Sequence, residues 1–349
     1  MVLDRELDIS FYFGDKMSDV KKMDYALLNS PVTELKNIKI GPFTWQKHAP
    51  KLAFLPYDAI IALGDPFFIS TWLLLLLCRI RKKPVILWTH GWYGRENRFK
   101  AIVKKSFFKL SSHIMTYGNY ARNLMILNGF DESRVSVLYN SLSYDMHLQL
   151  RGELVESNLY KDHFQNNLPN IVFVGRLTWV KRLDLLLNSL DISRKNGRLF
   201  NIVYIGDGIM KDSLIELSNS LGLSRFVWFY GATYDEKELS QLLYNADLCV
   251  APGNIGLTAI HALSFGCPCI SHNEFSLQMP EFESIIPGIT GDFYDFGSPE
   301  SLSNKILSWI DNHSNRNTIR QYCLNEVDLK WNPYSQIQTI KEVLSRVVK

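Results

Sequence analysis

The chain has 349 residues, of which 46% are hydrophobic and 21% charged, with a formal net charge of +3. This composition excludes an intrinsically disordered chain, and the length exceeds what one hydrophobic core normally serves, so two domains are expected. The five cysteines form no Cys-x-x-Cys pair, which favours buried thiols in a reducing cytoplasm over a disulfide framework or a zinc site. The N-terminus lacks the apolar segment of a signal peptide, and the longest apolar run, residues 67–78, is too short to span a bilayer.

Charge is unevenly distributed along the chain. Residues 1–150 hold 20 Lys and Arg against 13 Asp and Glu, a net charge of +7, whereas residues 151–349 hold 18 against 22, a net charge of −4. Most of the excess lies in residues 79–109, where ten basic residues and several aromatic ones accompany a single acid, Glu96. This segment could contact an anionic membrane surface, or it could be a solvated helix with its aromatic rings turned inward. No DNA- or RNA-binding motif accompanies it, so nucleic acid is not an expected partner.

Strand-like and helix-like segments alternate in the first half, which predicts a parallel sheet. The expected strands are residues 9–13, 59–63, 85–88, 112–116 and 135–139. His90 closes the run VILWTHG, so its imidazole is expected at the carboxyl end of a strand, where it either contacts a ligand or is merely hydrogen-bonded. Residues 146–169 are polar and lack periodicity, which predicts an interdomain linker.

The second half alternates in the same way and predicts a doubly wound domain. Its expected strands are residues 171–174, 201–205, 226–230, 247–250, 267–270 and 291–294. The expected helices between them are residues 180–195, 210–221, 236–244 and 256–265, and the last of three further helical stretches covers 333–348.

Two cations stand between the strand 171–174 and the helix that follows it. Arg176 and Lys181 are therefore expected at the carboxyl end of the sheet, where open α/β folds bind ligands. A guanidinium fork and an ammonium point charge near helix amino ends suit a diphosphate, although both could be solvated loop residues.

The segment APGNIGLTAIHALSFG, residues 251–266, predicts a second half of the same site. A helix starts near Gly256, so the backbone N–H groups of Gly256, Leu257 and Thr258 would point at an anion, helped by the helix dipole. No Asp-x-Asp pair occurs in the chain, so neither a metal ion nor another cofactor is expected.

These motifs resemble the donor-phosphate region of family 4 of the retaining GT-B glycosyltransferases. The resemblance rests on Gly-Arg-Leu at 175–177 with the lysine at 181, on Gly206-Asp207-Gly208, and on Met279-Pro280-Glu281. It implies an α/β, GT-B fold of two Rossmann-like domains that face each other across a cleft. Residues 1–150 would form the acceptor-side domain, 151–332 the nucleotide-sugar domain, and 333–349 a helix that crosses back to the first. The family's first strand and Gly-rich loop are not recognisable, because VLDREL leads directly into DISFYFG.

The sequence also departs from the family pattern. Members usually carry two glutamates, for the donor sugar and for the ribose, and the positions aligned with them are Gly253 and His261. His261 could bond a ribose or simply pack, and Glu281 becomes the candidate for the lost carboxylate. Arg182 stands where the family usually has glycine.

By the same resemblance, His90 would lie near the sugar and the β-phosphate, and Gly206 and Asp207 would form a turn near the nucleotide. Asp207 could instead be a helix N-cap.

The resulting hypothesis is a metal-independent, retaining hexosyltransferase. It would move a sugar from a nucleotide-diphosphate sugar to a glycan or lipid-linked glycan acceptor, as in surface-polysaccharide assembly. The expected location is the cytoplasm, with possible peripheral membrane contact through residues 79–109. Two alternatives remain open: a catalytically degenerate GT-B scaffold that binds a nucleotide or a partner protein, and a GT-B sugar epimerase or phosphorylase.

Overall fold

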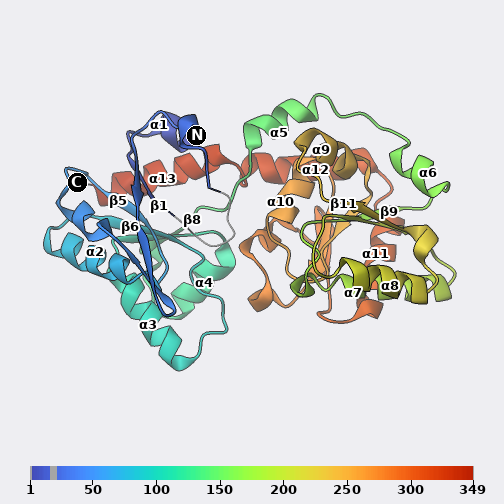
Figure 1. Cartoon of the computed structure of the whole chain (residues 1–349), viewed down its shortest axis with the longest axis horizontal. Coiled ribbons are helices and arrows are strands. Elements are labelled where there is room, and N and C mark those ends of the chain that lie inside the picture. The colour runs from blue at the N-terminus through green and yellow to red at the C-terminus, as the bar shows by residue number, and fades with distance from the viewer. Residues whose placement is uncertain (1, 16–21, 349) are drawn as a thin grey trace. The chain divides into compact units, whose positions relative to one another are not determined.

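The computed structural model describes residues 2–15 and 22–348 (Figure 1). The chain divides into two compact units, and the first runs from the N-terminus to Tyr139 and also includes Pro333 to the C-terminus. The second unit is the uninterrupted stretch Asn140–Asn332. The boundary therefore lies between Tyr139 and Asn140 and not after residue 150. Each unit contains a parallel sheet with helical connections, so the expected α/β class is confirmed.

A four-stranded parallel sheet, in the order β5-β6-β7-β8, organises the first unit. Its strands are β5 (Ile60–Leu63), β6 (Val85–Thr89), β7 (His113–Thr116) and β8 (Val135–Val137). The helices that connect them are α2 (Ile69–Ile80), α3 (Arg98–Lys109) and α4 (Asn119–Leu127). One core cluster packs α2 and α3 against the sheet, with Leu75, Phe107, Phe108 and Ile114 almost completely buried.

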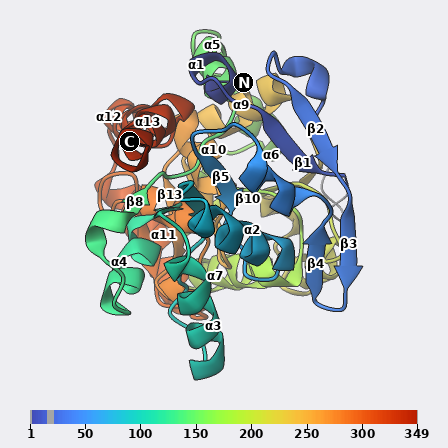
Figure 2. The same cartoon turned by 90° about the vertical axis from the view of Figure 1, so that its left-hand side faces the viewer.

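Three strands of the first unit, the second, third and fourth in chain order, were not predicted. The chain opens with α1 (Val2–Glu6) and β1 (Phe11–Gly14), and β1 pairs in parallel with β2 (Val32–Leu35). Strands β3 (Asn37–Ile40) and β4 (Phe43–Gln46) form an antiparallel hairpin, visible as a two-stranded ribbon in Figure 2. Its apolar residues Ile38, Ile40 and Phe43 are exposed, and the hairpin has no continuous apolar run of the kind that identifies a buried strand.

The last helix, α13 (Pro333–Val347), belongs to the first unit. Its residues Ile340 and Val343 are buried against Ile86 and Met115 of the sheet and against Leu138, which directly follows β8. The C-terminal segment thus completes a core whose other members come from the first 139 residues.

A six-stranded parallel sheet, in the order β11-β10-β9-β12-β13-β14, organises the second unit. Its strands are β9 (Asn170–Val174), β10 (Asn201–Ile205), β11 (Val227–Gly231), β12 (Leu248–Val250), β13 (Cys269–His272) and β14 (Gly291–Tyr294). Its principal helices are α7 (Leu183–Lys195), α8 (Lys211–Ser220), α9 (Glu236–Asn245), α10 (Leu257–Ser264), α11 (Pro299–Asn312) and α12 (Arg316–Leu329).

The strand order of this sheet reverses between β9 and β12. The chain adds β10 and β11 on one side of β9 and then returns to place β12 on its other side. Ligands of open α/β sheets bind at such a reversal, outside the carboxyl ends of the strands. The loops that leave β9 and β12 are therefore the first place to look for a site.

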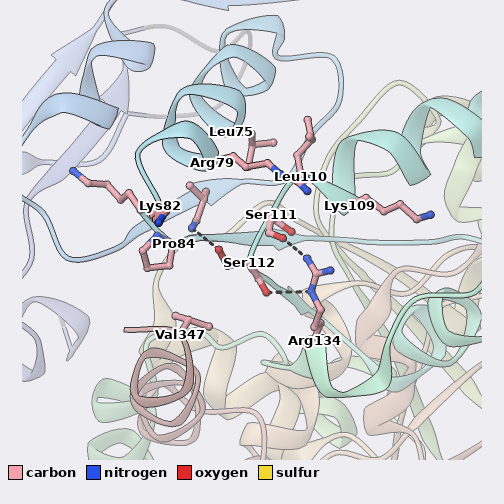
Figure 3. A pocket seen from close by; sticks show the side chains of 12 residues that line it. Leu75, Arg79, Lys82, Pro84, Lys109, Leu110, Ser111, Ser112, Arg134 and Val347 are labelled. Carbon is pink, nitrogen blue, oxygen red and sulfur yellow. Dashed lines mark hydrogen bonds between the residues drawn. The ribbon is translucent and has the colours of Figure 1, made fainter. Parts of the chain in front are cut away.

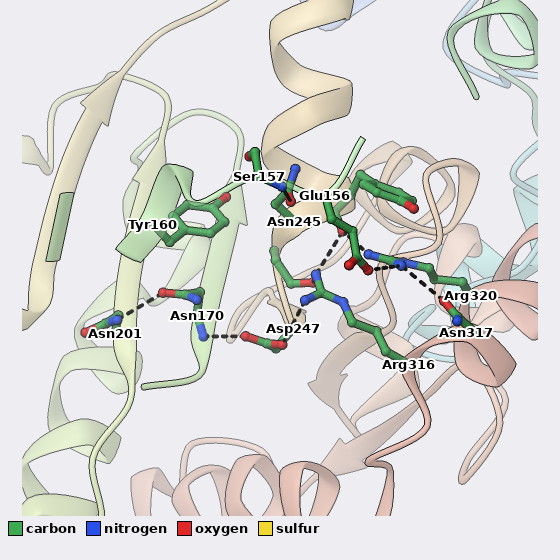
Figure 4. A network of polar contacts seen from close by, with 12 residues as sticks. Glu156, Ser157, Tyr160, Asn170, Asn201, Asn245, Asp247, Arg316, Asn317 and Arg320 are labelled. Carbon is green, nitrogen blue, oxygen red and sulfur yellow. Dashed lines mark hydrogen bonds and ion pairs between the residues drawn. The ribbon is translucent and has the colours of Figure 1, made fainter. Parts of the chain in front are cut away.

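Residues 146–169, predicted as a linker, are instead packed against the second unit. They contain most of α5 (Tyr144–Arg151) and all of α6 (Leu159–Phe164). The Tyr160 hydroxyl is buried and donates to the Leu242 carbonyl at 2.7 Å. Between the two helices, the Ser157 N–H donates to Asn245 at 2.9 Å and Arg320 bonds Glu156 at 3.0 Å (Figure 4). Side-chain partners distant in sequence hold this polar segment, which is why periodicity does not reveal it.

All five cysteines are free and buried, as expected of structural thiols. Within the described parts of the chain, no helix is both long and apolar enough to cross a membrane. Of the aromatic side chains in the basic segment 79–109, Trp92, Phe107 and Phe108 are buried and Phe99 is 75% exposed. Three of these rings thus face the core, while Phe99 and most of the basic side chains of the segment lie on the surface.

Candidate active site

The loop that leaves β9 presents Arg176 to solvent from a rigid backbone. On either side of it, the Gly175 N–H donates to the Ile205 carbonyl at 3.0 Å and the Leu177 N–H donates to the Asp207 carbonyl at 2.9 Å. The Arg176 side chain is exposed, and among the described residues it has no hydrogen bond or ion pair. A fixed loop thus carries an uncompensated cation at the carboxyl edge of the sheet.

The turn Gly206-Asp207-Gly208 supports this loop by close backbone contact. Gly206 has φ +152°, and a Cβ placed there would lie 1.9 Å from the Gly175 carbonyl oxygen. Asp207 is exposed and accepts the Gly208 N–H at 2.8 Å, whereas α8 is capped by Met210. The N-cap role considered for Asp207 is therefore wrong, because the helix starts later than the turn.

Lys181 connects the loop that leaves β9 with the loop that leaves β12. Its Nζ donates to the Asn254 carbonyl at 2.8 Å and to Asn254 Oδ1 at 2.9 Å. Burial lowers the pKa of Lys181, the positive charge of Arg176 lowers it further, and the nearby Glu281 raises it. The ammonium group is thus held by neutral acceptors, so part of its charge remains available to an anion.

Helix α10 begins directly after the β12 loop, with Gly256 as its N-cap. Within the described chain, the N–H groups of Gly256, Leu257 and Thr258 have no acceptor, as expected for a first helical turn. The Thr258 hydroxyl donates to the Val174 carbonyl at 3.0 Å, which seats this turn beside the end of β9. The helix start therefore adjoins the loop that carries Arg176.

Glu281 places a buried carboxylate oxygen beside Gly256, the N-cap residue of α10. Its side chain is 2% exposed, and Oε1 accepts from Asn140 Nδ2 at 2.8 Å. The other oxygen, Oε2, is buried without a hydrogen-bond partner and lies 3.9 Å from the ideal Cβ position of Gly256. Burial raises the pKa of Glu281, while Asn140 and Lys181 partly oppose that shift. A buried polar atom without a partner is costly, so this oxygen favours a hydrogen-bond donor at that position.

The β12 loop is fixed by three buried polar side chains that the sequence did not indicate. Gln278 accepts the Ile255 N–H at 2.8 Å and donates to Ser271 at 2.8 Å. The Tyr294 hydroxyl donates to the Pro252 carbonyl at 2.6 Å. Each is an ordinary polar residue at a strand end or in a loop, and only the folded backbone shows which partner it takes.

Gly253 is required by the packing of this loop. A Cβ there would lie 1.9 Å from the Val180 carbonyl oxygen, and the Gly253 N–H donates to the Lys181 carbonyl at 2.8 Å. The position aligned with the family's first glutamate thus accommodates no side chain on this backbone.

His261 is engaged by a carboxylate that sequence reasoning missed. Its Nε2 is 2.9 Å from Glu236 Oε2, and the ring lies parallel to that of His147 at 5.2 Å between centroids. His147 Nε2 is 3.5 Å from the same oxygen. These two imidazoles strongly lower the pKa of Glu236. The ligand atoms of the three residues lie within 4.8 Å of one another, and His147 Nδ1 is buried without a hydrogen-bond partner.

His90 lies in the first unit, at the carboxyl end of β6. Gly91 next to it has φ +67°, and a Cβ there would contact Thr116 at 3.0 Å. The ring centroid is 4.7 Å from that of Tyr117, and Nδ1 is buried without a partner. Burial lowers the pKa of His90, and Lys104 adds to the effect.

Comparison with known proteins identifies the second unit. Residues 158–325 match the family model "Glycosyl transferases group 1". A protein of the Klebsiella pneumoniae cps region, of 41.2 kDa, is 28% identical over 61% of this chain, which spans 54% of that protein. A glycosyltransferase of Methanocaldococcus jannaschii is 21% identical over 92% of this chain and 82% of its own length.

Solved structures agree with the fold described above. HepE of Anabaena in complex with UDP superposes with a TM-score of 0.72 at 17% identity, covering 97% of this chain and 100% of its own. The lipopolysaccharide outer core galactosyltransferase WaaB superposes with a TM-score of 0.68 at 16% identity, covering 94% of this chain and 88% of its own. Residues 158–325 therefore match the glycosyl transferases group 1 family model, in a chain with the fold of the GT-B glycosyltransferases.

Proposed function

We propose that the protein transfers a hexosyl group, with retention, from a nucleotide-diphosphate sugar to a glycan or lipid-linked glycan acceptor, without a metal ion. One observation carries the proposal. The carboxyl ends of β9 and β12 bring together Lys181, the unpaired N–H groups of α10 and the partnerless oxygen of Glu281, with the exposed Arg176 on the adjoining loop.

The cations act on the leaving group. Negative charge builds on the diphosphate as the glycosidic bond breaks, and preorganised donors that face it stabilise the transition state. Arg176 offers a planar fork, Lys181 a point charge, and the N–H groups of Gly256, Leu257 and Thr258 a helix amino end. The departing phosphate itself accepts the proton of the acceptor hydroxyl, so no separate carboxylate base is needed.

Glu281 supplies the carboxyl that Gly253 lacks. Its raised pKa increases the fraction of the neutral form, which donates a hydrogen bond through Oε2, while the ionised form accepts one from a sugar hydroxyl. Asn140 keeps the group in place.

The nucleoside is proposed to lie between the turn at Gly206 and Asp207 and the paired side chains of His261 and Glu236. His261 donates to Glu236, so a ribose hydroxyl that approaches this pair meets an ionised acceptor. His90 is retained as a candidate catalytic residue of the first unit.

The relatives support the donor and the pathway class. HepE was crystallised with UDP and with UDP-glucose, which makes these the first ligands to test. The cps-region protein and the galactosyltransferase WaaB support a role in surface-polysaccharide assembly. We place that role in the cytoplasm, at the membrane's inner face, with the basic segment 79–109 as the peripheral contact.

The decisive experiment is Arg176→Ala, with Arg225→Ala as the matched control. Both arginines are exposed cations of the second unit, but Arg225 lies over the Phe226 ring outside the site. Loss of one charge-assisted hydrogen bond, about 1.5–3 kcal/mol, lowers turnover of UDP-glucose roughly ten- to a hundredfold. Activity of the Arg176 variant within about twofold of the control overturns the proposal.

A second candidate function is a nucleotide-binding scaffold without chemistry, which Gly253 favours because that position can present no carboxylate. Thermal stabilisation by UDP, with no hydrolysis or transfer across a panel of UDP- and GDP-sugars, identifies the scaffold. Interconversion of the donor sugar, or release of a sugar phosphate, identifies an epimerase or a phosphorylase instead.

A further inference from the structure

The first unit contains a cavity at the edge of its sheet opposite to His90. This cavity has a volume of 330 Å³ and opens where β6, β7 and β8 begin (Figure 3). Pro84 and Val85 form its floor at the start of β6, and Ser111 and Ser112 line it just before β7. The carboxyl-terminal ends of α2 and α3 form its walls.

The lining of this cavity is strongly cationic. It contains five basic side chains and no acidic one: Arg79, Lys82, Lys83, Lys109 and Arg134. The ends of α2 and α3 contribute roughly half a negative charge each, which offsets only a minor part of five positive charges.

Three of these cations form no hydrogen bond or ion pair within the described parts of the chain. Arg134 bonds the carbonyls of Ser111 and Ser112, and Lys83 bonds the carbonyl of Leu55. Arg79, Lys82 and Lys109 have no hydrogen bond or ion pair with any residue that the structure describes. Like charges gathered in this way repel one another, so an anion that enters the cavity stabilises the unit.

Exposed apolar side chains lie beside the cations. Ile80 is 79% exposed, Phe54 57% and Leu76 46%. Leu76 and Ile80 are neighbours of the lining residue Arg79 on α2, and Phe54 lies under the Arg81 guanidinium, which is 5.1 Å from the centre of its ring, so exposed apolar side chains accompany the basic residues at this end of α2. Apolar side chains around a basic site are the composition of a surface that enters the headgroup region of an anionic bilayer.

We propose that this cavity binds the phosphate group of an anionic membrane lipid, while Phe54, Leu76 and Ile80 enter the interface around it. Arg79 would contact the phosphate oxygens and Lys109 would turn toward them, because neither has a competing partner among the described residues, whereas the Lys82 side chain points away to the other side in Figure 3. The inference rests on the proposed membrane contact and gives it a defined ligand, but it does not depend on sugar transfer.

The test is co-sedimentation of the full chain with phosphatidylcholine vesicles that contain or lack phosphatidylglycerol. The test variant is Arg79→Gln/Lys109→Gln, and the control is Lys36→Gln/Lys39→Gln, which removes the same charge from exposed residues of the same unit outside the cavity. Each cation near an anionic surface contributes about fivefold to partitioning, so the test variant is expected to bind about 25-fold more weakly and the control nearly as well as the unmodified chain.

Three results overturn the lipid site. Equal losses in both variants show a diffuse charge effect, and no binding of the unmodified chain to anionic vesicles removes the membrane contact. Stabilisation of the unmodified chain by inorganic phosphate, without vesicle binding, assigns the cavity to a soluble phosphate. UDP binding is measured on the same samples, so a failure here is distinguished from a failure of the proposed transferase site.

Discussion

Arg182 occupies a backbone conformation that costs an ordinary residue energy. Its φ of 47° and ψ of 43° lie in the left-handed region, where glycine is unstrained, and the resemblance places a glycine at this position. The side chain compensates in part through an ion pair with Asp184 at 3.3 Å. The exposed ion pair stabilises the fold only slightly, so it offsets only part of the cost of the backbone strain.

Arg182→Gly is therefore expected to raise the free energy of unfolding by up to about 1 kcal/mol, because relief of strain exceeds loss of the exposed ion pair. Urea denaturation measures the change. Arg182→Ala is the control, since it loses the ion pair but keeps the strain. A gain in the alanine variant as large as in the glycine variant contradicts the explanation.

Glu281 gives the site a pH dependence of known sign. Burial raises the pKa of this carboxyl in the folded state, so its favourable effect on stability is complete below the unfolded pKa and is lost as pH rises through the folded pKa. Glu281→Gln keeps the Asn140 bond and never ionises. It should raise the unfolding free energy by about 1–3 kcal/mol at pH 8 and have little effect near pH 4. Asn140→Ala, which removes the opposing hydrogen bond, should shift stability the other way at pH 8.

Residues with fixed backbone roles were the most predictable from the sequence. Gly206, Arg176 and Glu281 belong to short motifs, and the resemblance to the GT-B family implies that these motifs supply a turn, a cation and a carboxyl near one strand edge. Asn254 and Glu236 were missed because a polar residue in a loop or first helical turn has many possible partners. The fold alone decides that one bonds Lys181 and the other bonds His261.

At the scale of elements, two loops that interlock through glycines determine the site. The β9 loop and the turn at Gly206 approach so closely that no side chain fits between them. Buried parallel strands and the longer helices were predicted within a few residues, since their apolar pattern is continuous. The β3–β4 hairpin and α6 were not, since their stability comes from pairing and specific hydrogen bonds.

Gly206→Ala tests the interlocking. The added Cβ would lie 1.9 Å from the Gly175 carbonyl oxygen, so the Arg176 loop must move. We expect a loss of about 2–4 kcal/mol in stability, from overpacking and strain together, and weaker UDP binding by calorimetry. Gly222→Ala is the matched control: it also has positive φ, +66°, but its Cβ meets nothing within 4 Å. It should lose only about 1 kcal/mol and bind UDP normally.

At the scale of the molecule, the first unit depends on a helix from the opposite end of the chain. Ile340 of α13 is fully buried among Ile86, Met115 and Leu138. Ile340→Ala should therefore destabilise the first unit by about 2–5 kcal/mol. UDP affinity, which we propose to depend on the second unit, should stay unchanged, as calorimetry can establish. Ile289→Ala, at a 41% exposed position of the second unit, is the control and should change neither the stability of the first unit nor the UDP affinity. Equal loss of UDP affinity and stability in the Ile340 variant contradicts this independence.

Because the first unit is built from two separate segments of the chain, its folding during synthesis differs from that of the second unit. A nascent chain emerges from the ribosome in sequence order, and domains generally fold as units while it does so. The stretch Asn140–Asn332 is complete before Pro333 has been synthesised, whereas the first unit lacks α13 until residues 333–347 have been synthesised. The later half should therefore reach its native state first. Until α13 has been synthesised and has docked, the apolar sheet surface around Ile86 and Met115 is uncovered. We expect this surface to be the part of the nascent chain most accessible to chaperones and proteases.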